Sequence, residues 1–257
     1  MATNPYSAPT ANVSDPASAT HGNYVPGGQA VAAGRGWDWI TAGWDLFKRQ
    51  AGMWIALVLV AFVILLVLAF IPLLGNFLTP FLTIFFGAGV LIGCRAIEDG
   101  GELEIGHLFA GFREKLAPLA AVGGIYLAAS FAIVVVVMLV AGASVFAAFS
   151  GAAVPSFTAL ITGLLAGLVV LALMLPVVMA VWFAPALVVF HDQGAVEAMK
   201  ESFSGCLRNI MPFLVYGLIG LVLSILASIP LMLGWLALGP VFAGSLYASY
   251  KDIYLTS

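Results

Sequence analysis

Charged residues are scarce in this chain. Of its 257 residues, nine are Lys or Arg and twelve are Asp or Glu, so 8% are charged while 63% are hydrophobic. A soluble globular domain carries about 25% charged residues, and a chain with so few cannot cover its surface in water. The composition therefore predicts an integral membrane protein. A formal net charge of -3 also excludes the basic surface of a nucleic-acid-binding protein.

The chain also lacks the residue spacings of common catalytic and metal sites. Its two cysteines, Cys94 and Cys206, form no C-x-x-C pair, which favours a role as small packing residues. His107 lies on a predicted amphipathic helix and His191 at the membrane edge, with no H-E-x-x-H spacing. Helix capping and solvation are simpler roles for them than catalysis. We therefore predict no enzymatic activity, no cofactor and no metal.

Residues 1–34 carry neither the basic nor the apolar region of a signal peptide. They are rich in Ala, Pro, Ser, Thr, Asn and Gly, and the first basic residue of the chain is Arg35. Such a composition buries too little surface to offset chain entropy. We predict a disordered cytoplasmic tail over residues 1–34 and a six-span membrane domain over residues 35–257.

Long apolar runs fill most of the remaining chain. A membrane-spanning helix needs about 20 apolar residues, and the runs predict an all-α fold of six transmembrane helices in three hairpins. The fourth run would measure about 50 Å as one helix, so it must tilt or break, with Pro176 and Pro185 as candidate break points. Residues 141–157 form either a wide loop or a partly re-entrant segment. The spans cover roughly residues 53–71, 77–94, 119–140, 158–190, 211–228 and 232–250.

A charged amphipathic segment precedes each predicted hairpin. In the first, Trp37, Ile40, Trp44 and Phe47 recur at spacings of three and four, which places them on one helical face. Such a helix suits the bilayer interface, although an ordinary helix packed on protein has the same pattern. The second segment groups Ile105, Leu108, Phe109, Phe112 and Leu116; the third groups Val196, Met199, Phe203, Leu207 and Ile210, with Asp192 placed to cap it.

Three short blocks indicate an internal repeat. The blocks FKRQAGMW, FREKLAPL and CLRNIMPF begin at Phe47, Phe112 and Cys206, and in each of them basic residues precede the Met or Pro that opens a span. Divergent internal repeats are usual in membrane folds built by duplication. The predicted repeat units are residues 36–95, 103–190 and 194–250.

Charge is absent from one side of the predicted topology. All nine basic and all twelve acidic residues lie on the same side of the six spans, and the connections on the opposite side carry none. Positively charged connections stay in the cytoplasm. Both termini and all three amphipathic helices are therefore predicted to face the cytoplasm. The charged connections are residues 1–52, 95–118, 191–210 and 251–257.

Four motifs carry a resemblance to a known family. GWDLF leads into the first span, IGHLFAGFR precedes the third, EAMKESFSGCLRNIMPFL covers the last amphipathic segment, and YASYKDIY lies near the end. Across about residues 37–255 the chain resembles the BPSS-type six-helix membrane proteins of proteobacteria. The resemblance implies a multi-pass protein of the bacterial inner membrane and carries no assigned activity.

The predicted spans contain no ionisable side chain, which disfavours ion-coupled transport because such residues mark ion pathways. We therefore predict a non-enzymatic membrane scaffold or a component that binds lipid or a partner. The alternative is a transporter or export component for a lipid-like or small apolar solute, and an interfacial enzyme ranks last. Expected partners are membrane lipids and a second copy or another membrane protein, with no nucleic acid. The candidate contacts with the interface and with anionic lipid are Trp37, Trp44, Lys48, Arg49, Arg113, Lys115, Lys200 and Arg208.

Overall fold

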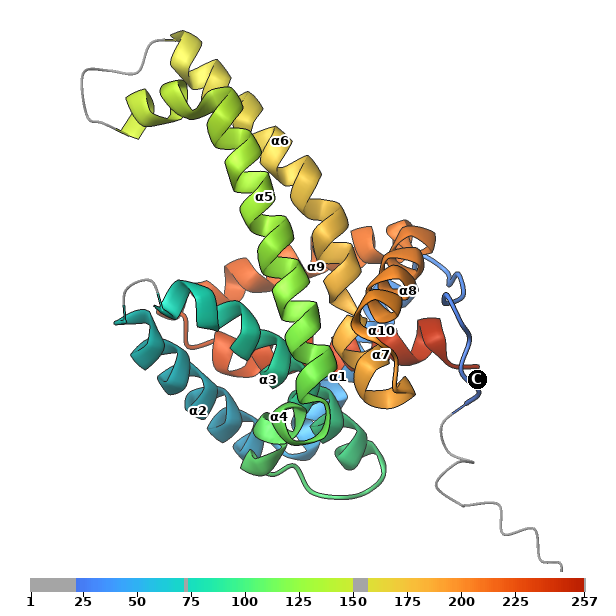
Figure 1. The fold of residues 1–257 in the computed structure, drawn as a ribbon. Coiled ribbons are helices and arrows are strands. Elements are labelled where there is room, and N and C mark those ends of the chain that lie inside the picture. The colour runs from blue at the N-terminus through green and yellow to red at the C-terminus, as the bar shows by residue number, and fades with distance from the viewer. Residues whose placement is uncertain (1–21, 72–73, 150–156, 257) are drawn as a thin grey trace, which may run out of the picture.

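Helices make up nearly all of the computed structural model, which describes residues 22–71, 74–149 and 157–256 (Figure 1). Within this part of the chain, the strand-like contact is a single antiparallel bridge between Tyr24 and Leu255. The predicted all-α class is confirmed. The helices are α1 (Arg35–Arg49), α2 (Ala51–Ala69), α3 (Leu74–Glu98), the 3-10 helix η2 (Ile105–Phe109), α4 (Ala110–Glu114), α5 (Leu116–Phe149), α6 (Phe157–Trp182), α7 (Ala184–His191), α8 (Ala195–Arg208), α9 (Ile210–Ser228) and α10 (Trp235–Tyr254).

Five stretches of helix are long and apolar enough to cross a membrane, judged by length and composition. Each corresponds to one of the predicted spans. The sixth predicted span, α10, is not among them, since it carries serine, tyrosine and glycine along its length and also includes Lys251 and Asp252. The five stretches are Ala51–Ala69, Phe77–Glu98, Leu116–Leu139, Ile161–His191 and Ile210–Ser228.

The helix α5 extends beyond its predicted span. It continues to Phe149, so residues 141–149 lengthen a helix where the sequence suggested a loop or re-entrant segment. Small residues such as those of this stretch are compatible with a helix, and alanine favours it. Residues 150–156 of the predicted segment lie outside the described part of the chain.

The long fourth apolar run breaks after Trp182. The helix α6 ends there, and α7 begins with Pro185 in its first turn, where a proline is tolerated because no intrahelical partner awaits its missing N–H. The break predicted at Pro185 is confirmed. Pro176 lies inside α6, which continues past it.

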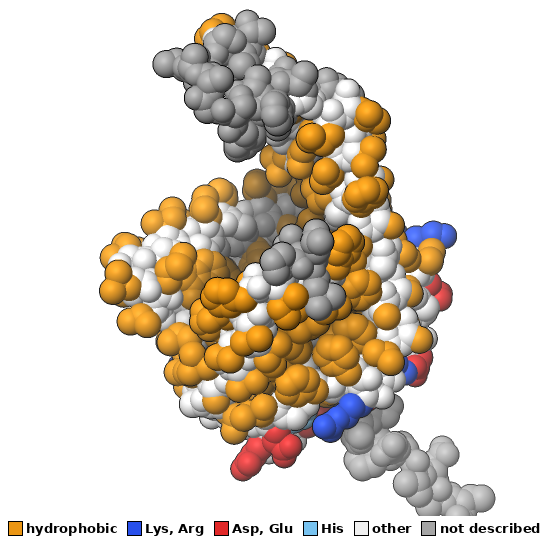
Figure 2. Space-filling model, turned by 60° about the vertical axis from the view of Figure 1, so that its left-hand side comes forward, with side chains coloured by type: hydrophobic (Ala, Val, Ile, Leu, Met, Phe, Trp, Pro, Cys, Tyr) orange, Lys and Arg blue, Asp and Glu red, His pale blue; other side chains and the backbone are white. Residues whose placement is uncertain are grey.

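The antiparallel pair α5 and α6 forms an arm that stands away from the other helices (Figure 1). None of residues 161–182 is buried. In Figure 2, hydrophobic side chains cover the visible arm and body, and the charged side chains lie along the lower and right-hand margins. The 34 residues of α5 give a length of about 50 Å. The arm can therefore cross a bilayer core of about 30 Å and project beyond it.

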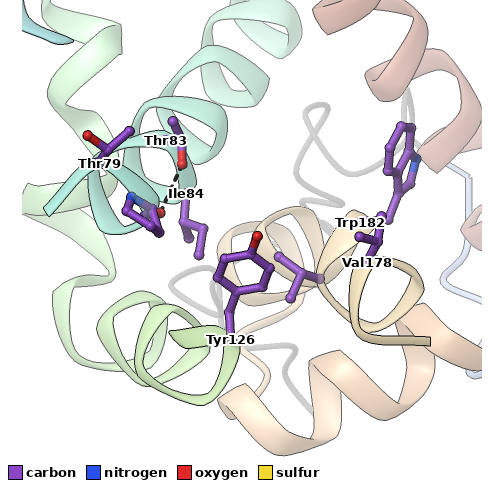
Figure 3. Close-up of a pocket in the computed structure, with 8 residues that line it drawn as sticks. Thr79, Thr83, Ile84, Tyr126, Val178 and Trp182 are labelled. Atoms are coloured by element: carbon purple, nitrogen blue, oxygen red, sulfur yellow. Dashed lines mark hydrogen bonds between the residues drawn. The ribbon is translucent and has the colours of Figure 1, made fainter. Parts of the chain in front are cut away.

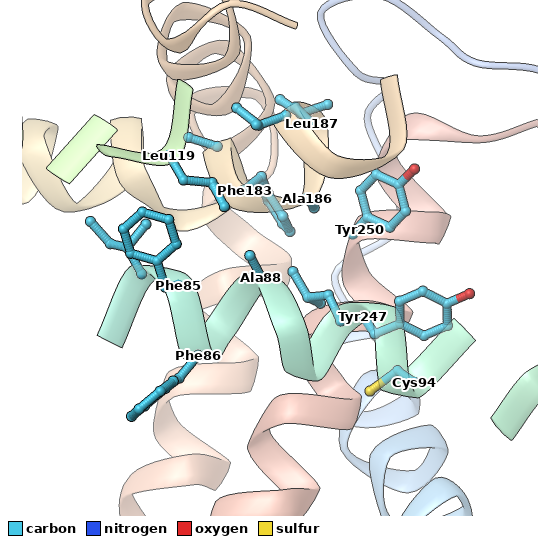
Figure 4. Close-up of a cluster of buried hydrophobic side chains, with 14 of the residues drawn as sticks. Phe85, Phe86, Ala88, Cys94, Leu119, Phe183, Ala186, Leu187, Tyr247 and Tyr250 are labelled. Atoms are coloured by element: carbon cyan, nitrogen blue, oxygen red, sulfur yellow. The ribbon is translucent and has the colours of Figure 1, made fainter. Parts of the chain in front are cut away.

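The core lies where α3, α7 and α10 meet the start of α5 (Figure 4). Phe85 of α3, Leu119 of α5, Leu187 of α7 and Tyr247 of α10 are all at most 3% exposed. The Tyr247 hydroxyl donates to a carboxylate oxygen of Glu98 at 2.7 Å. The helix α10, which is more polar than the candidate spans, is thus enclosed by protein, where its hydroxyl groups form hydrogen bonds.

Residues 22–34 form an ordered strap, so the predicted disordered tail over residues 1–34 is wrong for this part. The backbone N–H groups of Val25 and Gln29 donate to carbonyl oxygens at the end of α10, each at 2.8 Å. Composition indicates how much side-chain surface a segment can bury. It cannot reveal that a distant helix supplies hydrogen-bond partners for the backbone of that segment. Residues 1–21 lie outside the described part of the chain.

The predicted apolar face of α1 is divided between protein and surroundings. Ile40 and Phe47 are buried together with Trp39, on the side that packs against α9 and α10. Trp37 and Trp44 are 55% and 46% exposed. The alternative of a helix packed on protein therefore holds for Ile40 and Phe47, while Trp37 and Trp44 stay uncovered. Periodicity identifies apolar residues without showing which neighbour covers them.

The other two amphipathic segments differ from the prediction in a similar way. In α8, Met199 is buried while Val196 and Leu207 are 55% and 52% exposed. The second segment is not one helix, since it divides into η2 and α4, and Ile105 and Leu116 are 42% and 56% exposed. In all three segments, part of the predicted apolar face contacts protein and part is left uncovered.

Candidate functional site

One residue joins each amphipathic segment to the span that follows it. These joints are Gln50, Lys115 and Asn209, which occupy the fourth position of the three aligned blocks. Their backbone angles match, with φ and ψ of -144° and 47°, -137° and 43°, and -118° and 33°. Three positions aligned on sequence pattern thus adopt one backbone conformation. We call the three amphipathic segments and their joints the collar.

Two joints hold a distant backbone segment with a side-chain amide. Gln50 Oε1 accepts from the N–H of Leu103 at 2.6 Å, and Gln50 Nε2 donates to the carbonyl oxygen of Gly101 at 3.0 Å. Asn209 binds the strap in the same way, accepting from the N–H of Val31 at 2.8 Å and donating to the carbonyl two residues earlier at 2.9 Å. Each amide satisfies one donor and one acceptor of an irregular backbone segment.

The joint at the base of the arm is different. Lys115 forms an ion pair with Asp192, whose side chain is 82% exposed and whose backbone is left-handed at φ 56°. The prediction that Asp192 caps α8 is wrong, since Gly194 occupies the cap and Asp192 follows the end of α7. An exposed ion pair contributes about 0–1 kcal/mol, so this joint is the weakest of the three.

The joints connect the repeats in a closed cycle. Gln50 binds the segment that leads into η2, Lys115 binds the segment that leads into α8, and Asn209 binds the strap that leads into α1. Helix packing follows the same order, with η2 and α4 on α3, α8 on α6, and α1 on α10. Each amphipathic segment therefore packs on the second helix of the preceding repeat, and the third repeat is followed by the first.

Small side chains make these packing contacts close. A Cβ atom on Gly43 of α1 would lie 2.2 Å from a carbonyl oxygen of α10, and one on Gly89 of α3 would lie 2.1 Å from a carbonyl oxygen of η2. At the third contact, the Ser202 hydroxyl of α8 donates to the carbonyl of Met179 at 2.7 Å and accepts from the N–H of Phe183 at 2.9 Å. Ser202 thereby satisfies backbone groups at the break between α6 and α7.

An aromatic and polar cluster lies beneath the strap. Tyr24 stacks on His191 with ring centroids 3.9 Å apart, donates to Glu201 and accepts from Gln193 Nε2 at 2.6 Å. His191 Nε2 hydrogen-bonds to the Tyr250 hydroxyl at 2.6 Å. Burial raises the pKa of the Tyr24 phenol, and its hydrogen bond to Glu201 raises it further. The predicted solvation of His191 holds only in part, because Tyr24 of the strap covers one face of its half-buried ring.

The other His and Cys side chains of the described residues have structural partners or are buried. His107 Nδ1 accepts from the N–H of Glu104 at 2.9 Å, which confirms its predicted capping role. Cys94 and Cys206 are 0% and 3% exposed, and burial raises the pKa of the Cys206 thiol to about 12. Among the described residues, no three His, Cys, Asp or Glu side chains come together as a metal site.

Three of the cations predicted to contact lipid are engaged by the protein. Lys48 pairs with Asp45 at 2.8 Å, Lys115 belongs to the joint at the arm, and Arg208 Nη1 donates to the strap carbonyl of Gly28 at 2.7 Å. Arg208 in particular holds the strap against α8. The main contacts of these three cations are therefore with the protein itself.

The other candidates remain available at the surface. Arg49, Arg113 and Lys200 are exposed and form no ion pair within the described residues. Trp37 and Trp44 line an apolar groove of about 430 Å³ between α1 and the hairpin of α9 and α10. The structure brings the two tryptophans together but leaves the three cations on separate segments of the collar.

A second hollow, the arm–body cleft, separates the arm from α3. It has a volume of about 400 Å³, and its lining includes Thr79 and Thr83 of α3, Tyr126 of α5, and Val178 and Trp182 of α6 (Figure 3). All of its lining residues belong to candidate membrane spans. This cleft could not be identified from the sequence, because hydropathy locates spans without showing how far apart two pairs of helices stand.

The comparisons with known proteins agree with the membrane assignment. No protein-family model and no solved structure matches the chain. The chain is 28% identical over 223 residues to a probable inner membrane protein of Burkholderia thailandensis, and the alignment covers 81% of this chain and 80% of that protein. With its five candidate spans, the protein is an integral membrane protein, and the similarity supports a family of inner-membrane proteins.

Proposed function

We propose that this protein is a non-enzymatic scaffold of the bacterial inner membrane that also binds lipid through its collar. The closed cycle of three repeats carries the proposal. Each joint side chain binds the segment that leads into the next repeat. The collar therefore holds the three apolar helix pairs in one fixed arrangement. Fixed geometry with uncovered apolar helices is what a membrane scaffold requires.

The proposed topology has six crossings and two cytoplasmic termini. The strap is bonded to the end of α10 through Val25 and Gln29, so the strap and the end of α10 lie on one side of the membrane. Five candidate spans lead from residue 51 to residue 228, and an even number of crossings is needed to return. The 20 residues of α10 give about 30 Å, enough for the sixth crossing. Because α1 covers α10, this helix can be less apolar than a lipid-facing span.

The exposed collar cations are the proposed contacts with anionic lipid. Arg49, Arg113 and Lys200 lie within or at the end of the three amphipathic segments. A cation near an anionic membrane surface contributes about 1 kcal/mol. Exposed Trp37 and Trp44 add the aromatic anchoring typical of membrane interfaces. Lys48, Lys115 and Arg208 contribute less, because each already has a protein partner.

Native mass spectrometry of the purified protein with retained lipid tests the lipid-binding proposal. The triple variant Arg49→Gln, Arg113→Gln, Lys200→Gln should lower retention of phosphatidylglycerol over phosphatidylethanolamine by on the order of 100-fold if each cation contributes fully. The matched control neutralises three exposed carboxylates in or next to the collar, Glu102→Gln, Glu114→Gln and Glu197→Gln, and should leave retention equal or higher.

Two results would count against the proposal. Equal retention in the wild type and the cation variant would show that the collar does not select anionic lipid. A loss of retention in both triple variants would indicate a damaged fold instead of a lost charge contact. Unfolding temperatures measured on both variants separate these readings.

The arm–body cleft favours a second candidate, a transporter or export component for a lipid-like or small apolar solute. Its lining lies within candidate spans of α3, α5 and α6, and Pro80 and Pro176 lie inside two of these helices, where proline permits bending. Flux of such a solute into vesicles containing the protein, abolished by Pro176→Ala, would favour transport over a scaffold.

A further inference from the structure

The arm–body cleft contains a polar group that lacks a protein partner. Tyr126 is on α5, ten residues beyond Leu116, which places it about 15 Å along the helix from its start. Its hydroxyl points away from α5 into the space between α3 and α6 (Figure 3). No hydrogen bond to this hydroxyl forms within the described residues, and the ring is only partly covered.

A hydroxyl group on the opposite wall of the cleft bonds to its own helix. Thr83, on the opposite wall of the cleft, donates to the carbonyl of Pro80 at 2.9 Å. A threonine can do so because its hydroxyl is close to its own helix, whereas a tyrosine ring carries the hydroxyl away from it. A polar group left without a partner at membrane depth costs several kcal/mol. Tyr126 therefore calls for a partner that the cleft admits.

The cleft also restricts the charge of that partner. Its lining consists of apolar side chains, two threonines, Tyr126 and Trp182, with no ionisable carboxylate or amine. A charged group placed there would have no counter-ion, and desolvation would disfavour it. The volume of about 400 Å³ is within the usual range for a small-molecule site and opens beside apolar helices.

We propose that the arm–body cleft binds an uncharged lipid-like molecule whose hydroxyl or carbonyl oxygen hydrogen-bonds to Tyr126. This inference rests on the proposed lipid-binding function and gives it a second site, distinct from the collar cations. The apolar chain of the ligand lies along Val178 and its neighbours on α6. The ligand enters laterally from the bilayer, because the cleft is bounded by helices of two separate hairpins.

Photolabelling of the full-length protein in phospholipid vesicles tests this site. The probe is a monoacylglycerol with a diazirine in its acyl chain, and the comparison probe is the fatty acid with the same chain, which is anionic. Peptide mapping should place the monoacylglycerol label on residues 79–84, 126 and 178–182. Tyr126→Phe should reduce this labelling about fivefold, the loss expected for one neutral hydrogen bond, and Val178→Trp, which fills the cleft, should reduce it at least tenfold.

Ser130→Ala is the matched control. Ser130 lies one turn further along α5, and its buried hydroxyl also has no partner, but it does not line the cleft. Labelling should be unchanged in this variant. The unfolding temperature of Tyr126→Phe should equal that of the wild type, because the hydroxyl makes no protein contact.

The outcomes distinguish this site from the collar. Label outside the cleft, or equal labelling of the wild type and Tyr126→Phe, would overturn the cleft site while leaving the collar proposal intact. Equal cleft labelling by the fatty acid would overturn the requirement for an uncharged ligand. Absence of label together with absence of lipid retained at the collar would overturn both proposals.

Discussion

The hairpin of α9 and α10 and the arm of α5 and α6 differ in what covers their second helix. The helix α10 is buried by α1 and the strap, with residues such as Ser245 and Tyr250 at 0% and 3% exposure. By contrast, none of residues 161–182 of α6 is buried. The polarity of each helix matches how far protein covers it. The covered helix α10 carries serine and tyrosine, while the uncovered helix α6 is almost entirely apolar.

The difference in protein cover explains why hydropathy alone identifies the arm more readily than α10. A lipid-facing helix must be apolar around its whole circumference, whereas a helix covered by protein can satisfy hydroxyl groups on its neighbours. The joints on these two sides of the molecule also differ in how strongly they are held. On the covered side of the molecule, the buried side-chain amide of Asn209 brackets the strap by hydrogen bonding to its backbone. On the side that bears the arm, the joint is an exposed ion pair of Lys115.

The largest expected effect comes from loss of the close contact between α1 and α10. Gly43→Ala should lower the free energy of unfolding by about 3 kcal/mol, because the added Cβ would lie 2.2 Å from a backbone carbonyl of α10. Denaturant titration in detergent micelles measures this loss. Gly52→Ala is the control: it meets no atom within 4 Å, and alanine favours the helix by about 1 kcal/mol.

The next effect concerns the bracket that holds the strap. Asn209→Ala should destabilise the protein by about 2–3 kcal/mol, because it leaves a backbone N–H and a carbonyl of the strap without partners. Asn209 is 0% exposed, so water does not replace its bonds. Limited proteolysis should cut the strap in this variant, and Asn23→Ala, at an exposed strap position, should stay resistant. Equal resistance of both variants would show that the bracket does not hold the strap.

Alkaline pH should release the strap by a smaller amount. The pKa of Tyr24 is raised in the folded protein above its usual value of about 10. The contribution of the phenol to strap docking is therefore fully present below pH 10 and is lost as the pH rises toward the folded pKa. Above pH 10, cleavage of the strap by an alkaline protease should increase by less than tenfold per pH unit, since Tyr24 is partly exposed. Tyr24→Phe should remove this pH dependence.

The smallest effect should come from the joint at the arm. Lys115→Ala should change the free energy of unfolding by less than about 1 kcal/mol, because its partner Asp192 is 82% exposed. Chemical denaturation at low and high salt measures the change, and it should shrink as salt screens the pair. A loss as large as that of Asn209→Ala would contradict the contrast between the two sides of the molecule.

Much of the fold follows from residue patterns. Five of the six spans predicted from apolar runs correspond to candidate spans of the structure, and Pro185 marked a helix break. The blocks beginning at Phe47, Phe112 and Cys206 placed three joints in register. These features are local, because length, hydropathy and proline chemistry act within one helix. The repeat pattern is the one long-range feature that sequence alone made visible.

The partners of the joints could not be predicted. Gln50 and Asn209 bind backbone groups of residues 101–103 and 29–31. Every residue except proline offers the same backbone N–H and carbonyl, so the sequence does not mark which of them are bound. The prediction of a disordered tail was wrong over the strap for the same reason, since the strap is held through its backbone groups. The available signal was that the fourth position of each block holds Gln, Lys or Asn, three side chains that can donate a hydrogen bond from the start of an apolar span.

We infer that the three repeats close into a cycle through the strap, and a cross-link tests this closure most directly. The N–H of Thr256 donates to the carbonyl of Asn23 at 2.9 Å, next to the antiparallel bridge, where Cα atoms of facing residues are about 5.5 Å apart. A disulfide fits this separation. In membranes containing the variant Asn23→Cys, Thr256→Cys, mild oxidation should give a circular chain. After cleavage at a protease site inserted within residues 150–156, this chain should run as one species until it is reduced. The pair Asn23→Cys, Phe157→Cys should not cross-link, and two fragments from both variants would contradict the closed cycle.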